Sequence, residues 1–257
     1  MRLLALALSV ALAGPALAQN SSMDVGPQAL DLRYQPGDAA APLAAFDGTV
    51  TSVGFYGSTA AFSGFYGSQT TLTSPTGVSV GGFDVSLGGN VHLVPLGARG
   101  SLYVPLRFQV GSRYLSGDGA PGDPTDDMAV LLGGADLGTG LGAVLDVPLR
   151  EGGAVERLHS YGTVVLGAGF SGDYAMSFPG DTPDPGAYGM RTATVMLQSE
   201  ARGLFGSSVG ASLGYTLRAA QLDTEAIDSG AGVFNAFTGS NFRSAETSHL
   251  IRVGLIF

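Results

Sequence analysis

The sequence predicts an all-β fold, a transmembrane antiparallel up-and-down β-barrel, and three observations indicate it. Of the 257 residues, 41 are Gly and only 13% are charged, yet 45% are hydrophobic. Glycine at that density disfavours long helices, and many segments alternate apolar and polar residues with the period of a strand. After the first 18 residues no apolar run is long enough for a membrane helix, so a closed barrel is the spanning structure that remains.

The composition excludes several other classes of protein. The chain has no Cys, which excludes a disulfide scaffold and a thiolate metal site. All 12 basic residues are Arg and the net charge is −9, so we expect no nucleic-acid partner, which would require a basic face. High hydrophobicity with low charge is also the reverse of the balance found in disordered chains.

The N-terminus has the features of a cleaved secretory signal peptide, residues 1–18. Arg2 supplies the positive start, residues 3–13 form an apolar core, and Ala16-Leu17-Ala18 is a cleavage site. Residues 19–45 are expected to be an extended lead-in, and residues 46–257 the barrel.

Seven strands can be followed from residue 77 onwards. They are predicted at residues 77–95, 101–114, 127–149, 156–174, 190–202, 207–222 and 246–257. In the clearest of them, Leu102, Val104 and Leu106 lie on one face, whereas Arg107 and Arg113 lie on the other. Short connections at 96–100, 150–155 and 203–206 alternate along the chain with long polar connections at 115–126, 175–189 and 223–245. This alternation of short and long connections is typical of an up-and-down barrel.

The region before residue 77 decides the number of strands. It holds a β-rich stretch, Thr49–Tyr56, and a duplicated Gly-Phe-Tyr-Gly-Ser at 54–58 and 64–68. Read as one long strand running into a loop, residues 46–73 give a barrel of eight strands. The alternative divides this region and adds a strand at residues 29–34, which gives ten.

The C-terminus carries the most specific pattern. The chain stops at Phe257, with Leu255, Val253 and Ile251 before it at alternate positions. In this respect it resembles bacterial outer-membrane β-barrels, and its strand and loop pattern resembles the small OmpA/OmpX/OmpW-like group. The resemblance implies that these four residues are a signal for the barrel-assembly machinery. It also implies an outer-membrane location, contact with outer-membrane lipid and a periplasmic lead-in. No OmpA-type periplasmic domain follows the barrel in this sequence, so its tethering role is not implied.

Charged residues fall on the strand faces opposite the apolar ones and are therefore predicted to line the lumen. The predicted lumen charge network comprises Asp84, Arg107, Asp136, Asp146, Arg157, Glu200, Arg218 and Arg252. Arg113, Asp173, Arg202 and Glu246 lie on the same inner faces. An eight-stranded barrel is just wide enough for side chains to fill, and a buried unpaired charge is costly. We therefore expect salt bridges to fill the lumen; the alternative is a narrow or gated ion path.

Few residues could support catalysis. His92 and His159 are predicted low in the barrel and His249 on its outer face, so the three cannot meet at one site. Residues 167–172 fit a dinucleotide-binding fingerprint, but no helix follows them. Two G-x-S-x-G matches lie at strand starts, where no nucleophile elbow can form. We expect no catalytic residues, no cofactor and no metal site.

The long connections are acidic. They carry Asp118, Asp123, Asp126, Asp127, Asp181, Asp184, Asp223, Glu225 and Asp228. Such carboxylates could bind divalent cations, although their spacing is not that of an EF-hand. The sequence therefore predicts a monomeric barrel with a structural or surface-contact role through acidic loops. The first alternative is a small pore or transporter for ions or small solutes, and the second is an outer-membrane enzyme.

Overall fold

The computed structural model describes residues 21–35, 44–57, 60–71, 74–118, 129–177, 186–227, 238–239 and 241–257. The strands are β1 (Ser22–Tyr34), β2 (Ala44–Tyr56), β3 (Ala60–Thr71), β4 (Ser74–Pro95), β5 (Gly100–Asp118), β6 (Ala129–Pro148), β7 (Arg157–Ser177), β8 (Ala187–Arg202), β9 (Gly210–Ala226) and β10 (Phe242–Ile256). A single 3-10 turn, η2 (Leu204–Gly206), follows β8. Across these ranges no helix is both long and apolar enough to cross a membrane.

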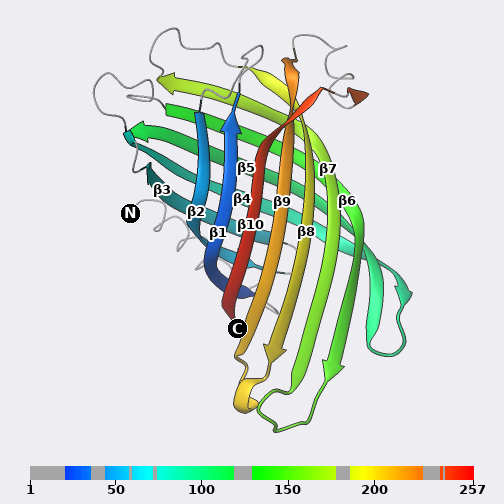
Figure 1. The fold of residues 1–257 in the computed structure, drawn as a ribbon. Helices are drawn as coiled ribbons and strands as arrows, with labels where there is room; N and C mark the ends of the chain where they lie inside the picture. Colours follow the sequence, from blue (N-terminus) through cyan, green and yellow to red (C-terminus); the bar gives the residue numbers. More distant parts are fainter. Residues whose placement is uncertain are drawn as a thin grey trace.

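The strands close into one antiparallel barrel (Figure 1). Each strand pairs with its neighbours in the chain, and the pairing of β1 with β10 closes the sheet, from Ser22↔Ile256 to Leu32↔Glu246. The predicted all-β, antiparallel, up-and-down architecture is therefore confirmed. The closure matters because it leaves neither β1 nor β10 as a free edge.

The predicted number of eight strands is wrong: the barrel has ten. Residues 46–73 are divided into β2 and β3 by a turn after Tyr56, and Ser22–Tyr34, within the predicted lead-in, is β1. The ten-strand alternative is thus the observed one. The signal of β1 is weak because its inner face starts polar, at Asp24 and Gln28, and ends apolar, at Leu30 and Leu32. Neither face therefore shows one continuous apolar stripe.

The two ends of the barrel differ. The turn end holds the connections β2–β3, β4–β5, β6–β7 and β8–β9, together with the start of β1 and the end of β10. It lies at the bottom of Figure 1. Gly97, Gly152 and Gly203 adopt φ of 68°, 69° and 67° there, a conformation that favours glycine in tight turns. The opposite end is the loop end, where most connecting residues lie outside the described ranges.

The strands are strongly staggered. Ser22 pairs directly with Ile256, at the C-terminal end of β10. When the register is followed from Ser22 the other way around the barrel, through β2 and each following strand to β9, it arrives instead at Arg243, near the start of β10. The stagger around the barrel is about twelve residues, which goes with strand tilts of about 35–45°. Side chains alternate between lumen and outer surface along every strand, as the period of two requires.

Candidate functional site: the filled lumen

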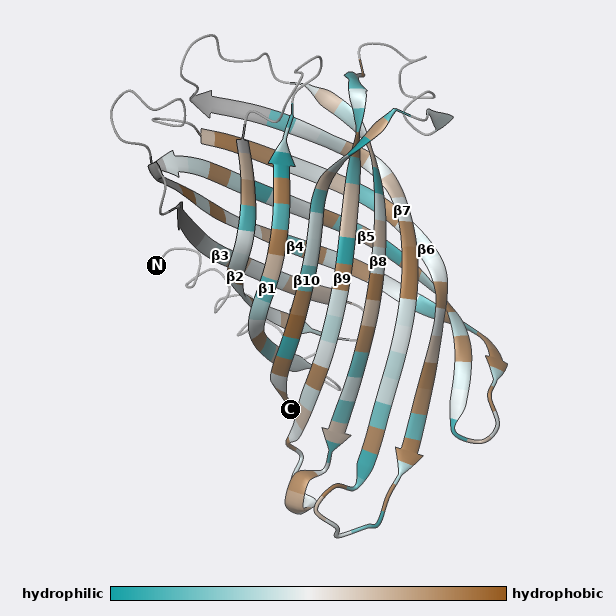
Figure 2. Ribbon diagram, in the orientation of Figure 1, coloured by the Kyte–Doolittle hydropathy of each residue, from teal (hydrophilic) through white to brown (hydrophobic). Residues whose placement is uncertain are grey.

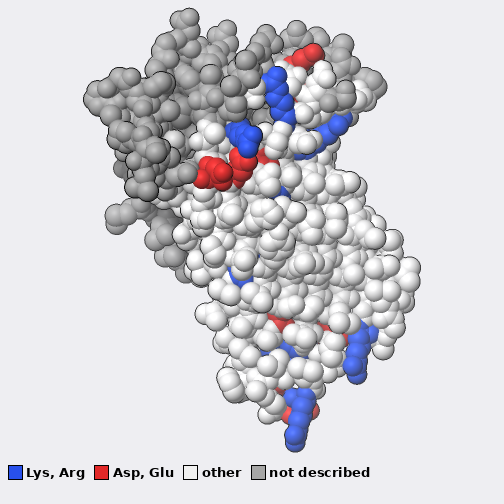
Figure 3. Space-filling model, in the orientation of Figure 1, with Lys and Arg blue, Asp and Glu red and all other residues white. Residues whose placement is uncertain are grey.

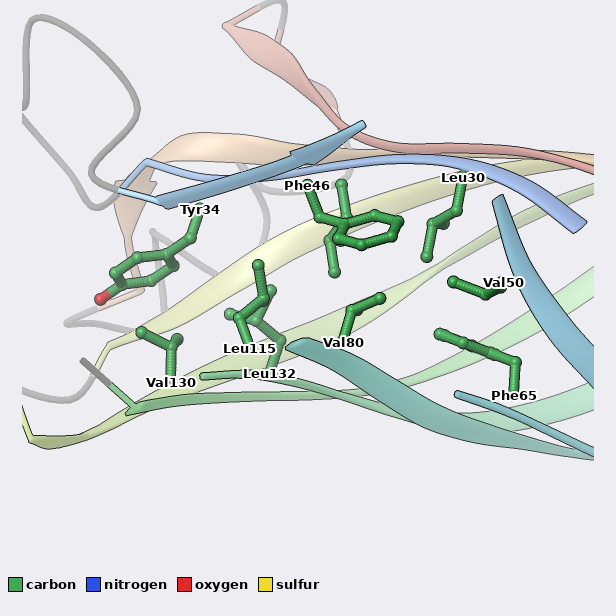
Figure 4. Close-up of a cluster of buried hydrophobic side chains, with 10 residues drawn as sticks. Leu30, Tyr34, Phe46, Val50, Phe65, Val80, Leu115, Val130 and Leu132 are labelled. Atoms are coloured by element: carbon green, nitrogen blue, oxygen red, sulfur yellow. The ribbon is translucent and has the colours of Figure 1, made fainter. Parts of the chain in front are cut away.

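The loop half of the lumen is filled by an apolar cluster, shown in Figure 4. It consists of inward side chains from β1 to β6: Leu30, Leu32, Tyr34, Phe46, Val50, Phe65, Val80, Leu115, Val130 and Leu132. Val80, Leu115 and Val130 are completely buried. Each such side chain contributes about 1.5–3 kcal/mol on burial. The sequence predicted a lumen filled by charges, whereas this half is closed by a hydrophobic core.

Next to this core lies the Arg113 cluster, defined as Asp84, Arg113, Arg218 and Glu246. Arg113 Nε and Nη2 donate to the two Glu246 carboxylate oxygens at 2.7 and 3.1 Å. Arg113 Nη2 also donates to both Asp84 oxygens, at 3.1 and 3.0 Å. Arg218 Nη1 donates to Glu246 at 2.6 Å. Two positive and two negative groups therefore balance inside the barrel, which lowers the cost of burying them.

Arg113 uses its whole guanidinium group. Its Nη1 donates to the carbonyl oxygens of Phe83 and Ser112 at 3.1 and 3.0 Å, and the group lies 5.1 Å from the ring centroid of Phe65. Only 5% of Arg113 is exposed. The side chain joins β5 to β4 and, through Glu246, to β10 across the lumen.

A cavity of about 50 Å³ separates the Arg113 cluster from part of the apolar cluster. Asp136 and Arg218 line it together with Leu132 and Met190. Asp136 is buried, and among the described residues no acceptor bonds to Arg218 Nε. Most of the lining is apolar, but Asp136 and Arg218 supply polar groups, and the space is large enough for a few water molecules.

The turn half of the lumen contains the Arg252 cluster, defined as Asp24, Gln198, Glu200, Arg202 and Arg252. Arg252 is 1% exposed; its Nε lies 3.9 Å from Asp24 Oδ2, and its Nη2 donates to Gln198 Oε1 at 3.0 Å. Gln198 Nε2 donates to Glu200 at 2.9 Å, and Glu200 pairs with Arg202. The Arg252 guanidinium also lies 4.0 Å from the Tyr56 ring centroid.

The remaining predicted lumen charges join neither cluster. Arg107 donates to Gly89 O and to Asn90 Oδ1, each at 2.8 Å, and forms no ion pair within the described part of the chain. Asp146 and Arg157 pair at 3.4 Å with 44% and 55% of their side chains exposed. The predicted lumen charges are therefore distributed over two buried clusters, one exposed pair, one arginine bonded to neutral groups and the buried Asp136 beside the cavity.

Arg107 has a specific position on the sheet. The pairing of β3 with β4 ends at Ala60↔Leu87, so β4 continues to Pro95 paired with β5 alone. Arg107 crosses over Gly88 and bonds to the backbone of β4 immediately beyond the end of that pairing. Its charge thus helps to satisfy polar backbone groups where the sheet is open, which would otherwise be costly in a low-dielectric environment.

Large lumen side chains lie directly opposite glycines. In register these pairs are Asp24↔Gly254, Asp84↔Gly111, Tyr103↔Gly142, Arg107↔Gly88, Arg113↔Gly82 and Arg252↔Gly214. A Cβ at Gly214 would lie 2.9 Å from both Nε and Nη2 of Arg252. Inward glycines therefore provide the space that the clustered side chains occupy, which accounts for part of the high glycine content.

The outer surface of the turn half is apolar. Ile251, Val253, Leu255 and Phe257, the predicted assembly signal, lie in a row on the outside of β10 with 54%, 54%, 61% and 58% exposure. Figure 3 shows a mostly uncharged zone across this wall, with most of the charged groups nearer the two ends. Figure 2 shows hydrophobic positions recurring along the same strands.

The histidines are apart, as the sequence predicted. His92 Nδ1 bonds to Ser101 at 2.9 Å near the turn end, and His249 Nδ1 bonds to the Tyr215 hydroxyl at 2.8 Å on the outer face. His159 lies in the lumen near the turn end. In the described ranges no three His, Asp or Glu side chains are grouped to hold a metal ion. The acidic residues at 123, 126, 127, 181, 184 and 228 lie outside the described residues.

Sequence reasoning missed Asp24, and it placed Arg113, Gln198 and Glu246 on the inner face without identifying their partners. Asp24 was missed because its strand was interpreted as lead-in. The alternation of Met23, Asp24 and Val25 was the available signal. The pairing of Arg113 with Glu246 carries no sequence signal, since 133 residues separate them.

No protein-family model matches the chain, and no curated protein sequence matches it. Among solved structures, it aligns with the outer membrane protease OmpT from Escherichia coli. The identity is 10% and the TM-score 0.38, over 93% of this chain and 95% of that chain. At that similarity the alignment carries no argument about function, and the architecture described above rests on the strand pairing itself.

Proposed function

We propose that the chain is an integral, monomeric outer-membrane β-barrel with a closed lumen and no enzymatic activity. Its role is in envelope structure or in surface contact through the loops at the loop end. The observation that carries this proposal is the filling of the lumen: the apolar cluster and the Arg113 cluster together join β1–β6 to β9 and β10. A lumen closed in this way leaves the exterior and the loops as the functional surfaces.

The outer surface supports membrane insertion. Leu137, Leu166 and Leu213 are 68%, 64% and 58% exposed on three different strands of the turn half. A water-soluble barrel of this size rarely exposes so continuous an apolar surface. Lipid would cover these side chains, and the backbone groups that pair from strand to strand would need no water; the segment of β4 beyond Leu87, which pairs with β5 alone, is the exception.

Conductance of the refolded protein in a planar bilayer tests the closed lumen. We expect no steady conductance, because the buried side chains of the apolar cluster occupy the loop half of the lumen. A variant carrying Phe46→Ala and Leu115→Ala is the matched control, since it removes bulk from that cluster and should increase leakage. A steady open channel in the unmodified protein would refute the closed barrel and favour the small pore or transporter, which the polar turn half of the lumen also fits.

Deletion of Phe257 tests the proposed assembly signal. The residue is 58% exposed on the outer face and contributes no lumen contact, so its loss should reduce barrel yield in membranes while leaving refolding in detergent unchanged. An Ile256→Val variant at the adjacent inward position serves as control. Normal membrane yield of the Phe257 deletion would contradict recognition of this residue by the assembly machinery.

A further inference from the structure

We propose that the bilayer surrounds only the turn half of the barrel, and that the loop half stands in water as a barrel with its own apolar core. This inference rests on the proposed membrane insertion and adds where the membrane ends. Lipid would then contact only the outer surface of the turn half. The outer surface of the loop half would face water and would be available to soluble partners.

Strand β1 shows the reversal on which the proposal depends. In its first half the inward side chains are polar, including Asp24 and Gln28, and the outward ones are apolar, including Met23 and Val25. After Ala29 the arrangement is reversed. Leu30, Leu32 and Tyr34 are buried inside, whereas Asp31 and Arg33 face outwards and form an ion pair of 2.9 Å. A strand in lipid needs the first arrangement, whereas a strand in water needs the second.

Two further strands, β9 and β5, also change the character of their outer face toward the loop end. Outward positions of β9 are apolar or aromatic from Ala211 through Tyr215 and Leu217 to Ala219, and then become Gln221 and Asp223. On β5 the outward row passes from Phe108 and Val110 to Ser112, Tyr114 and Ser116, so polar and aromatic residues replace the aliphatic ones, while the inward row includes the fully buried Leu115. The change from an apolar to a more polar outer face is therefore found on β5 and β9 as well as on β1, although β3, β6 and β7 keep the outward apolar residues Tyr66, Leu131 and Phe170.

The positions of the outward charged side chains give an independent estimate of where the membrane ends. The outward charged side chains of the described strands all lie in the loop halves: Asp31, Arg33, Asp47, Arg191, Asp223 and Glu225. Asp31 and Asp47 lie directly opposite each other in register. Two facing carboxylates would be strongly unfavourable in hydrocarbon, and an arginine at the midplane of a barrel wall costs about 2–4 kcal/mol. These residues mark the level where water begins.

The height of the apolar zone fits a bilayer. From Gly210, where β9 begins, to Ala219 the strand rises about 3.3 Å per residue. At a tilt of about 40° this gives a height of about 23 Å, close to the apolar band of about 25 Å that is usual in outer-membrane barrels. Arg191 lies at the upper limit of this zone, where it contacts the Phe242 ring at 3.9 Å and donates to Gly239 O at 2.6 Å. Cationic and aromatic groups together are typical of a membrane interface.

Single cysteines test the boundary directly, because the chain has none of its own. Outward positions below the proposed limit, Ala29→Cys and Leu217→Cys, are compared with positions above it on the same strands, Arg33→Cys and Gln221→Cys. Each variant is labelled with an environment-sensitive fluorophore and refolded into phosphatidylcholine vesicles. Quenching by doxyl-labelled lipid and by aqueous iodide is then measured, and folding is checked by heat-modifiable gel mobility.

We expect lipid quenching to dominate at residues 29 and 217 and iodide quenching to dominate at residues 33 and 221, each by roughly tenfold, because iodide does not enter the hydrocarbon. If all four positions are quenched by lipid, the boundary is wrong but membrane insertion stands. If all four are quenched by iodide alone, insertion itself is wrong. Should Arg33→Cys fail to fold, Asp47→Cys probes the same level on β2, and the same two outcomes apply.

Discussion

Replacing Glu246 with Gln tests the buried charges at the position where most contacts converge. Its carboxylate accepts bonds of 2.7 and 3.1 Å from Arg113 and of 2.6 Å from Arg218. Its side chain is 5% exposed and that of Arg113 is 6% exposed. Gln keeps the shape and one acceptor oxygen, but its amide nitrogen would face an arginine N–H, and the cluster would gain one net positive charge.

The expected loss can be estimated from those contacts. A hydrogen bond to a charged group contributes about 1.5–3 kcal/mol, and removing one partner of a buried ion pair typically costs about 3–5 kcal/mol. Because Gln retains one acceptor, we expect the free energy of unfolding to fall by about 3–4 kcal/mol. Asp84 remains to neutralise Arg113 partly, which argues against a still larger loss.

Urea unfolding in phosphatidylcholine vesicles measures this change. The chain has no Trp, so the strand signal in far-ultraviolet circular dichroism is followed, together with gel mobility. Asp146→Asn is the matched control, since the Asp146–Arg157 pair is exposed and such pairs contribute about 0–1 kcal/mol. If Glu246→Gln unfolds within about 0.5 kcal/mol of this control, the Arg113 cluster does not hold the barrel together as argued.

Two further substitutions test the packing of the lumen in the same unfolding assay. Gly214→Ala should lower the free energy of unfolding by about 1–3 kcal/mol, because the added Cβ would displace the confined Arg252 guanidinium. Gly89→Ala is the control and should be near neutral, since nothing lies within 4 Å of its Cβ. Equal effects of the two substitutions would contradict the role assigned to the inward glycine. Leu115→Ala should cost about 2–5 kcal/mol through the cavity that it leaves in the apolar cluster. Leu137→Ala, on the outer face with 68% exposure, should cost much less, and a reversed order would place the core elsewhere.

The candidate site was partly predictable. The period of two assigned the face of each side chain, and Arg107, Arg113 and Arg252 lie inside as expected, because shifting a strand by one residue would reverse all of its side chains. Partner choice was not predictable. Whether Arg252 meets Asp24 depends on the closure of β1 against β10, which brings together residues from opposite ends of the chain.

The sequence by itself determined the class of fold, the alternation along each strand and the acidic, lysine-free composition, because these depend on local periodicity and residue type. Only the tertiary structure decided the number of strands, the pairing of buried charges and the filling of the loop half by Leu30, Val80 and Leu115. The physical reason is that a barrel's interior forms by closure. The sequence around an inward apolar residue does not indicate which other strands that residue will contact. The register and stagger of the closed barrel bring such residues from several strands into one core.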